Sequence, residues 1–328
     1  MDSVKHSLEQ GRSVTSPYIS LARRAIVQHT SVASGRRVAW VEMGAADGDP
    51  VLYFHASGSS KLEASLFHDA ALRQGFRIIA IDRPGVADSD FDYANDPANA
   101  CLDAIEVLNY LHIGKVSTLT LGLGAVYGLA FANIARGRVK SQLSLGAIPP
   151  GPLIATRAQT GVDVLLRRSF AKLVRHAWVL QHLLDRRGPQ DQIALLKDEL
   201  GGADRRALED RALSEFLLFD KGQALKQGGK GIAQDESIGM SPFDYHLSEL
   251  EIDIDFWQGG RDGDSSGRVA SLIAQELPQA RARTFAKQGY FFFLANRTEL
   301  FAHLSSPNRL SDNSARDTAR RENKFAAA

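Results

Sequence analysis

Short runs that are apolar, or that alternate between apolar and polar residues, recur along the chain and predict eight β-strands. Helical patterns separate most of the later runs. This order predicts an α/β fold with an opening antiparallel meander, then a mainly parallel sheet with helices on both faces. The predicted strands cover residues 26–32, 37–43, 51–55, 77–82, 116–122, 141–147, 252–258 and 281–286.

The alternation of strands and helices stops between residues 149 and 248, where amphipathic stretches take its place. They predict a helical cap inserted into a core made of residues 26–148 and 249–305. Ligands in open α/β sheets bind at the carboxyl edge of the strands, so we expect the cap to cover that edge. Residues 1–25 are polar with a weak helical pattern and form an N-terminal extension, and the polar residues 306–328 predict a disordered tail.

No charged side chain occurs between Lys115 and Arg136, a length that approaches a membrane span. The run nevertheless contains Gly122, Gly124 and Gly128, and it lies between segments that alternate as in a parallel sheet. We therefore expect a buried strand that turns into a buried helix, and no membrane partner.

Composition is that of a globular protein, since 44% of the 328 residues are hydrophobic and 23% are charged. The 39 basic and 38 acidic residues nearly cancel and are scattered, which argues against nucleic acid as a partner. The single cysteine, Cys101, excludes an internal disulfide and a cysteine-based zinc site, and we expect no metal or cofactor. The polar N-terminus lacks the apolar core of a secretory signal, so we expect a cytoplasmic protein.

Several segments, in this order, resemble the α/β-hydrolase superfamily over residues 26–305. "VLYFHASGSSKLEA" is similar to a strand followed by the oxyanion loop, and "RIIAIDRPGVADSD" to the D-R-P-G-x-G-x-S segment. "LGLGAVYGLAFA" resembles the G-x-S-x-G nucleophile turn, "FWQGGRDGDSS" the turn that bears the acid, and "FAKQGYFFFL" the loop that bears the base. The resemblance implies an α/β-hydrolase fold with a sheet of about eight strands and an inserted helical cap.

The groups that perform hydrolysis in this superfamily are missing at the matching positions. Gly124 occupies the position of the nucleophile, and Tyr290 occupies that of the basic histidine. A phenol, with a pKa of about 10, donates a hydrogen bond at neutral pH but does not readily accept a proton. Asp262 keeps the position of the acid, and Ala56 replaces the glycine of the oxyanion loop. We therefore do not expect a conventional serine hydrolase.

Two histidines lie near these segments, and neither is an obvious replacement for the base. His55 precedes the oxyanion loop, where we expect it to bond to nearby backbone. His303 falls in the predicted final helix, where we expect a packed or solvated side chain.

The backbone of the turn still predicts a binding site. The amides of Ala125 and Val126 are expected to point from the N-terminus of the following helix, where a carboxylate or carbonyl oxygen can bind. Gly124 is expected to leave room for a ligand atom. The implied partner is a small apolar or aromatic molecule with a carbonyl or carboxylate group. The candidate ligand-binding residues are Ala56, Ser57, Gly124, Ala125 and Tyr127, with further polar groups at Ser59, Asp262 and Tyr290. Apolar walls could come from the cap side chains Phe170, Trp178, Leu180 and Phe219, although such residues more often form the core of a cap than the lining of a pocket.

Three functions stay open. The first, which fits the sequence best, is a non-hydrolytic pseudohydrolase that binds a small molecule. The second is a divergent enzyme of isomerase, cyclase or lyase type, in which Tyr290 acts as acid and Asp262 as base. The third is a hydrolase with a relocated nucleophile at Ser57 or Ser59, for which the sequence offers no base.

Overall fold

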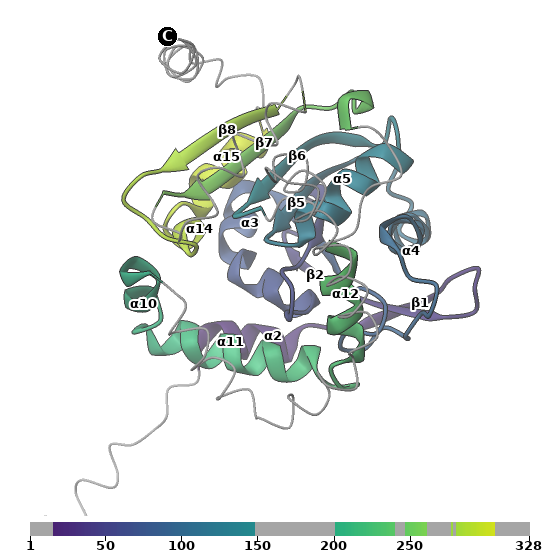
Figure 1. Cartoon of the computed structure of the whole chain (residues 1–328), viewed down its shortest axis with the longest axis horizontal. Helices are drawn as coiled ribbons and strands as arrows, with labels where there is room; N and C mark the ends of the chain where they lie inside the picture. Colours follow the sequence, from purple (N-terminus) through teal and green to yellow (C-terminus); the bar gives the residue numbers. More distant parts are fainter. Residues whose placement is uncertain (1–15, 148–200, 240–246, 261–276, 278–279, 306–328) are drawn as a thin grey trace, which may run out of the picture.

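The computed structural model describes residues 16–147, 201–239, 247–260, 277 and 280–305. More than half of the predicted cap, most of the N-terminal extension and the predicted disordered tail lie outside these residues. The described residues include an eight-stranded sheet with helices packed against it (Figure 1).

All the predicted strands are present, and their bounds lie close to the predicted ones. They are β1 (Gln28–Ser31), β2 (Arg37–Gly44), β3 (Asp49–Phe54), β4 (Phe76–Ile81), β5 (Val116–Leu121), β6 (Val139–Leu145), β7 (Ile254–Gly259) and β8 (Ala280–Phe285). Their order in the sheet is β1-β2-β4-β3-β5-β6-β7-β8. β2 runs antiparallel to β1 and β4, and every other pair is parallel. The predicted fold class is confirmed.

Alternate residues of the central strands pack into two apolar layers, one on each face of the sheet. On β2 and β3, Trp40 and Phe54 belong to one layer, while Val41 and Tyr53 belong to the other. The first layer is covered by α4 (Pro97–Tyr110) and α5 (Gly124–Ile134). The second is covered by α3 (His68–Gln74), α14 (Phe292–Ala295) and α15 (Arg297–Ser305). Both faces are thus buried, as a parallel sheet requires.

The uncharged run between Lys115 and Arg136 forms β5 and α5. Every residue of β5 is buried, and so is α5 as far as Ala132. Gly128 lets α5 approach the sheet closely, because a Cβ there would lie 2.6 Å from Cγ2 of Thr120. The prediction of a buried strand followed by a buried helix is confirmed. In the part of the chain that the structure describes, no helix is long and apolar enough to cross a membrane.

Among the described residues, three helices lie between β6 and β7 in the chain, and we call them the insertion helices: α10 (Gly202–Ala207), α11 (Arg211–Ala224) and α12 (Lys230–Gly239). A short 3-10 helix, η2 (Leu247–Glu249), follows them. Asp210 caps the start of α11, since its carboxylate accepts a hydrogen bond from the amide of Ala212 at 2.9 Å. The insertion helices fall within the region predicted as a cap, and η2 lies at its end.

The helix α2 (Pro17–Arg24), which lies in the predicted N-terminal extension, runs beside α11 (Figure 1). The rings of Tyr18 and Phe216 meet edge to face, with centroids 5.7 Å apart. The hydroxyl of Ser16 donates to the carbonyl of Ala212 at 2.7 Å. This end of the extension is therefore packed against an insertion helix.

Candidate functional site

The turn between β5 and α5 has its apex at Gly122. This glycine has a positive φ of +55°, and α5 starts only at Gly124. A Cβ built on Gly122 would lie 3.0 Å from the hydroxyl of Tyr290 and 3.6 Å from Cβ of Ala56. The residue at such a strand-to-helix turn is the one that projects from the sheet. The assignment of the apex to Gly124 is therefore wrong by two positions.

Gly124 faces the end of β3. A Cβ there would lie 2.2 Å from the carbonyl oxygen of Phe54 and 3.0 Å from that of His55. The space that Gly124 was expected to leave for a ligand atom is thus filled by backbone. Glycine is needed here because α5 begins in direct contact with the strand.

Tyr290 lies where β5 and β6 end. Its hydroxyl is next to Gly122, and a Cβ on Gly146 would lie 2.9 Å from Cε2 of its ring. The ring meets Phe291 and Phe293 edge to face, with centroids 5.4 and 6.2 Å away. The structure thus brings the predicted residue Tyr290 to the turn, and the glycines after both strands give the phenol its place.

The two amides that were expected to bind a ligand are already bonded. The amide of Ala125 donates to the carbonyl of Gly122 at 3.2 Å, and the amide of Val126 donates to that of Leu123 at 3.0 Å. The expectation for both amides is therefore wrong, because they close the first turn of α5. No described residue accepts a hydrogen bond from the amide of Leu123. Leu123 directly follows the apex, where this fold places an oxyanion donor.

Buried side chains hold the loop after β3 through contacts with its backbone. The amide of Ala56 donates to Oε2 of Glu63 at 2.8 Å, so this amide is not open to a ligand. Nδ1 of the buried His55 lies 2.8 Å from the carbonyl oxygen of Ala56, which confirms the expected contact with nearby backbone. Burial, followed by the charge of Arg83, holds the pKa of His55 well below its usual value. His55 is therefore neutral at pH 7.

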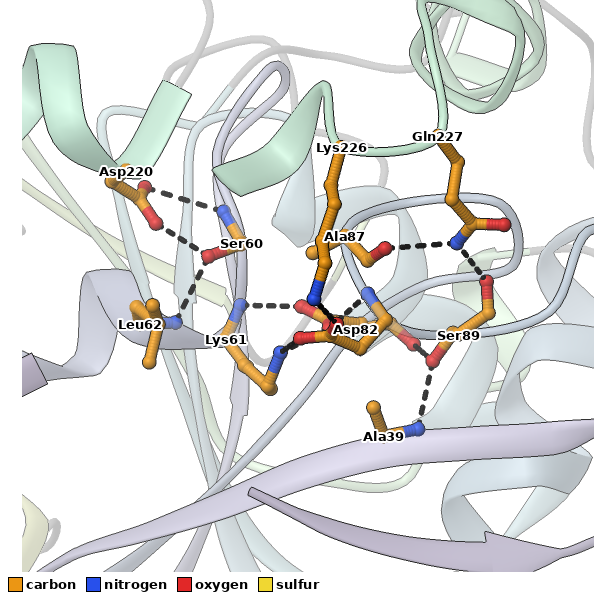
Figure 2. A network of polar contacts seen from close by, with 11 residues as sticks. Ala39, Ser60, Lys61, Leu62, Asp82, Ala87, Ser89, Asp220, Lys226 and Gln227 are labelled. Atoms are coloured by element: carbon orange, nitrogen blue, oxygen red, sulfur yellow. Dashed lines mark hydrogen bonds and ion pairs between the residues drawn. The ribbon is translucent and has the colours of Figure 1, made fainter. Parts of the chain in front are cut away.

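Carboxylates from the insertion helices reach the same loop. Asp220 of α11 accepts hydrogen bonds from the hydroxyls of Ser59 and Ser60, and Figure 2 shows Asp220 facing Ser60. Glu236 of α12 accepts a hydrogen bond from the hydroxyl of Ser57. The two serines considered as relocated nucleophiles are thus paired with carboxylates.

Asp235 of α12 forms a buried ion pair with Arg83, with N–O distances of 2.6 and 2.8 Å. The hydroxyl of Tyr127 donates to the same carboxylate at 2.5 Å, and the Tyr127 ring lies 4.7 Å from the guanidinium carbon. Arg83 also donates to the carbonyls of His55 and Ala56, at 2.6 and 3.2 Å. Tyr127 was predicted to bind a ligand, but its hydroxyl holds α12 to the core.

A further carboxylate, Asp204 of α10, contacts the loop that carries Tyr290. Its Oδ1 accepts a hydrogen bond from the amide of Phe291 at 3.1 Å. A Cβ on Gly289 would lie 2.3 Å from both oxygens of the same carboxylate. Each of the three insertion helices therefore places at least one acid against a loop at this edge of the sheet.

Burial raises the pKa of three of these acids. Burial, followed by the charge of Glu63, raises the pKa of Asp220 to about 7. Burial likewise raises the pKa of Glu63 and that of Glu236. A carboxyl with a pKa of about 7 exists in both charged and neutral forms at physiological pH. Asp220 is therefore an acid beside the loop that can change its charge near neutral pH.

A second polar cluster ties the start of the 3-10 helix η1 (Lys61–Leu66) to the segment after β4 (Figure 2). Nζ of the buried Lys61 lies 2.6 Å from Asp82 and 2.7 Å from Asp88. Lys226, which follows α11, also donates to Asp88. Asp88 thus pairs with a lysine at the far end of the loop and with one that follows α11.

Four of the predicted residues lie outside the described residues: Asp262, Phe170, Trp178 and Leu180. Phe219 packs at the contact of α11 with α2, since the guanidinium carbon of Arg23 lies 5.6 Å from its ring. His303 is buried beside Asp255, with an N–O distance of 2.9 Å, which agrees with a packed side chain. Among the described residues, no three His, Cys, Asp or Glu side chains are grouped as metal ligands would be.

The sequence analysis missed the acids of the insertion helices. Asp220 lies on the same stripe of α11 as the buried Leu213, Phe216 and Ala224. A buried acid on an apolar stripe needs a polar partner inside the protein. The position of Asp220 among the apolar residues of α11 was therefore the sequence signal for a buried polar contact. Its partners are not predictable from the pattern, because Ser60 lies 160 residues away in the chain.

No protein-family model matches the chain. The chain is 30% identical over 94 residues to an uncharacterized hydrolase, YcgS, of Bacillus subtilis (strain 168), a match that covers 29% of this chain and 33% of that protein. It is 32% identical over 145 residues to the dihydrolipoyllysine-residue acetyltransferase component of the acetoin cleaving system of Pseudomonas putida, covering 42% and 37%. The chain thus spans about a third of the length of the curated relatives that it matches.

Solved structures resemble the whole described architecture. A hydrolase from Pseudomonas aeruginosa PA01 is similar with a TM-score of 0.65 and 18% identity, covering 85% of this chain and 98% of that one. An esterase, EaEST, from Exiguobacterium antarcticum has a TM-score of 0.66 and 16% identity, covering 86% and 98%. Likeness at such identities establishes the fold and leaves the activity open. Together with the order of the strands and the turn at Gly122, it shows that the chain has the α/β-hydrolase fold.

Proposed function

We propose that this chain is a non-hydrolytic pseudohydrolase, which binds a small molecule at the Gly122 turn under a cap that includes the insertion helices. One observation carries the proposal: the apex of the turn has no side chain, and its neighbour is the hydroxyl of Tyr290. Nucleophilic catalysis needs a reactive atom at the apex and a base within hydrogen-bond reach. Glycine supplies no such atom, and a phenol is protonated at neutral pH.

The groups at the turn support a ligand that has a carbonyl or carboxylate oxygen on an apolar or aromatic body. The amide of Leu123 and the phenol of Tyr290 are hydrogen-bond donors beside the apex. Ala56, Ser57 and Tyr290 are half-buried, so a ligand can reach them, whereas Leu123 is buried. The small net charge argues against nucleic acid or a membrane surface as the partner. We also propose a cytoplasmic location for the protein.

A hydrolase with a relocated nucleophile is the second candidate, because the hydroxyl of Ser57 is bonded to Glu236. Burial raises the pKa of that carboxyl, which makes it a stronger base than an exposed glutamate. The divergent enzyme that uses Asp262 with Tyr290 stays a prediction, since Asp262 lies outside the described residues.

Two measurements test the proposal. A fluorophosphonate probe labels activated serines, and we expect no labelling of the wild type. A thermal-shift panel of paired aromatic esters and acids should contain compounds that raise Tm, because a ligand that binds only the folded state stabilises it. Stoichiometric labelling that Ser57→Ala abolishes would support the relocated nucleophile instead. A panel without any stabilising compound would contradict ligand binding.

Tyr290→Phe tests the site itself with a compound found in that panel. Loss of one hydrogen bond should weaken its affinity by about twofold to tenfold. Tyr110→Phe is the matched control, because Tyr110 is 60% exposed on α4. Equal affinities of the Tyr290→Phe variant and the control would place the ligand elsewhere.

A further inference from the structure

Two buried acids from different parts of the fold meet beneath α11. Asp220 of α11 receives the hydroxyl of Ser60, and its Oδ2 lies 3.3 Å from the Ser60 amide. Glu63 of η1 receives the hydroxyl of Tyr53 at 2.6 Å and the amide of Ala56 at 2.8 Å. Both carboxyls are buried. The contact of α11 with the loop after β3 therefore depends on acids that are removed from water.

The hydroxyl of Ser59 connects the two acids. It is hydrogen-bonded to Asp220, and it also lies beside Glu63. A serine hydroxyl has one proton, so it can donate to only one carboxylate at a time. If both acids were ionised, the oxygen of Ser59 would face the oxygen of the second carboxylate with no proton between them. One proton on either acid removes this conflict, because that carboxyl can donate to the oxygen of Ser59.

Two basic groups near this pair are bound to other acids. Arg83 is paired with Asp235, and Lys61 with Asp82 and Asp88. A shared proton is therefore the simplest way to lower the charge of the pair. Among the described residues, the other titratable groups that face the pair or α11 include Tyr53 of β3, Tyr290 after β8, Lys221 of α11 and Arg23 of α2.

We propose that Glu63 and Asp220 share one proton through Ser59, and that this proton keeps α11 docked on the loop that carries Ala56, Ser57 and Ser59. When it is lost, two buried negative charges repel each other across the contact, and α11 separates from the loop. The linkage itself needs no ligand. Its consequence, that rising pH opens the ligand site, rests on the proposed function.

The direction of the pH effect follows from where the proton is held. Burial, with the charge of Glu63, raises the pKa of Asp220 to about 7, whereas the exposed carboxyl of an undocked α11 has a pKa of about 4. The docked form therefore binds the proton more tightly. Between these two values the docked form loses stability as pH rises, and above the higher one the effect levels off.

Hydrogen exchange of the α11 amides from pH 5 to pH 8, divided by the intrinsic rates, measures this opening. We expect the opening constant of wild-type α11 to rise up to about tenfold per pH unit between pH 5 and 7 and then to level off. Helix α4 serves as an internal reference, and its opening constant should rise less. An α11 constant that does not change with pH, or an equal rise in α4, would refute proton-linked docking.

Variants assign the effect to the pair. Asp220→Asn should remove the rise, because an amide does not titrate. Glu215→Gln on the same helix is the matched control and should keep it, since Glu215 forms a surface pair with Arg211. If Asp220→Asn does not fold, Glu63→Gln is measured instead. Because this variant lacks the charge of Glu63, the rise in the opening constant of α11 should occur at lower pH. A wild-type profile in Asp220→Asn, or in Glu63→Gln, would overturn the proposal, whatever the ligand panel shows.

Discussion

Two glycines of one turn have different physical roles. Gly122 adopts a positive φ at the apex, and Gly124 lies against the carbonyl of Phe54. At Gly122 the nearest atom to an added Cβ is the hydroxyl of Tyr290, at the movable end of a side chain. At Gly124 the nearest atom belongs to backbone, which cannot move aside. Sequence spacing does not distinguish the two, because both positions read as glycine in "GLGA".

Alanine at each position should separate these roles. Gly124→Ala should lower the free energy of unfolding by about 3 kcal/mol, because the new Cβ overlaps the backbone of Phe54. Gly122→Ala should cost about 1–2 kcal/mol, mainly from the left-handed backbone conformation. Urea unfolding of both variants measures the difference. Equal losses, or a larger loss at Gly122, would contradict the position of the apex.

Serine at the apex tests what the turn lacks. Gly122→Ser alone should leave hydrolysis of a nitrophenyl ester at background, because Tyr290 cannot act as a base at neutral pH. Adding Tyr290→His supplies an imidazole at the same place, and should raise the rate about 100-fold or more over the single variant. Rapid turnover by Gly122→Ser alone would show that another base serves the turn.

At the scale of elements, the insertion helices are held to the core by acids. The ion pair of Asp235 with Arg83 is buried, with side chains 2% and 3% exposed. Removal of one partner leaves a buried charge without its counterion, whereas removal of both leaves none. The pair therefore has a large effect on α12 through the cost of breaking it, even if its net contribution to stability is small.

A double-mutant cycle measures this coupling. Arg83→Met should cost about 3–5 kcal/mol, and the addition of Asp235→Leu should recover part of that loss. We expect a coupling energy of about 2 kcal/mol or more from urea unfolding of the four proteins. The exposed pair of Arg37 with Asp90 is the control, with side chains 61% and 37% exposed, and should give less than about 1 kcal/mol. Similar coupling in both pairs would contradict the burial argument.

At the scale of the whole molecule, the sequence predicts the sheet well and the site only in part. Strand patterns are local, because each strand alternates its faces within a few residues, so all eight strands were found. The place of Tyr290 followed from its segment, but the turn was misplaced by two residues. The contacts of Asp220 and Asp235 join residues far apart in the chain, from 108 positions for Tyr127 to 161 for Ser59. Only the folded chain brings them together.

Burial and pairing give two aspartates opposite effects on the stability of the whole protein. The pKa of Asp220 is raised to about 7, so the folded state binds its proton more tightly than the unfolded state does. Burial also acts to raise the pKa of Asp88, but hydrogen bonds from Lys226 and Lys61 outweigh it and lower that pKa to about 2. The unfolded state therefore binds the Asp88 proton more tightly.

These signs predict opposite pH profiles for two matched amide variants. Relative to wild type, Asp220→Asn should gain up to about 1.4 kcal/mol of stability per pH unit as pH rises from about 4 to 7, because wild type loses the stabilising proton in that range. Asp88→Asn should lose stability relative to wild type as pH rises from about 2 to 4, the range in which the paired carboxylate becomes ionised. Urea unfolding at several pH values measures both differences, from which the titration of His55 and other common groups cancels. A relative stability of Asp220→Asn that is independent of pH would show that its carboxyl ionises in the folded protein as it does in water.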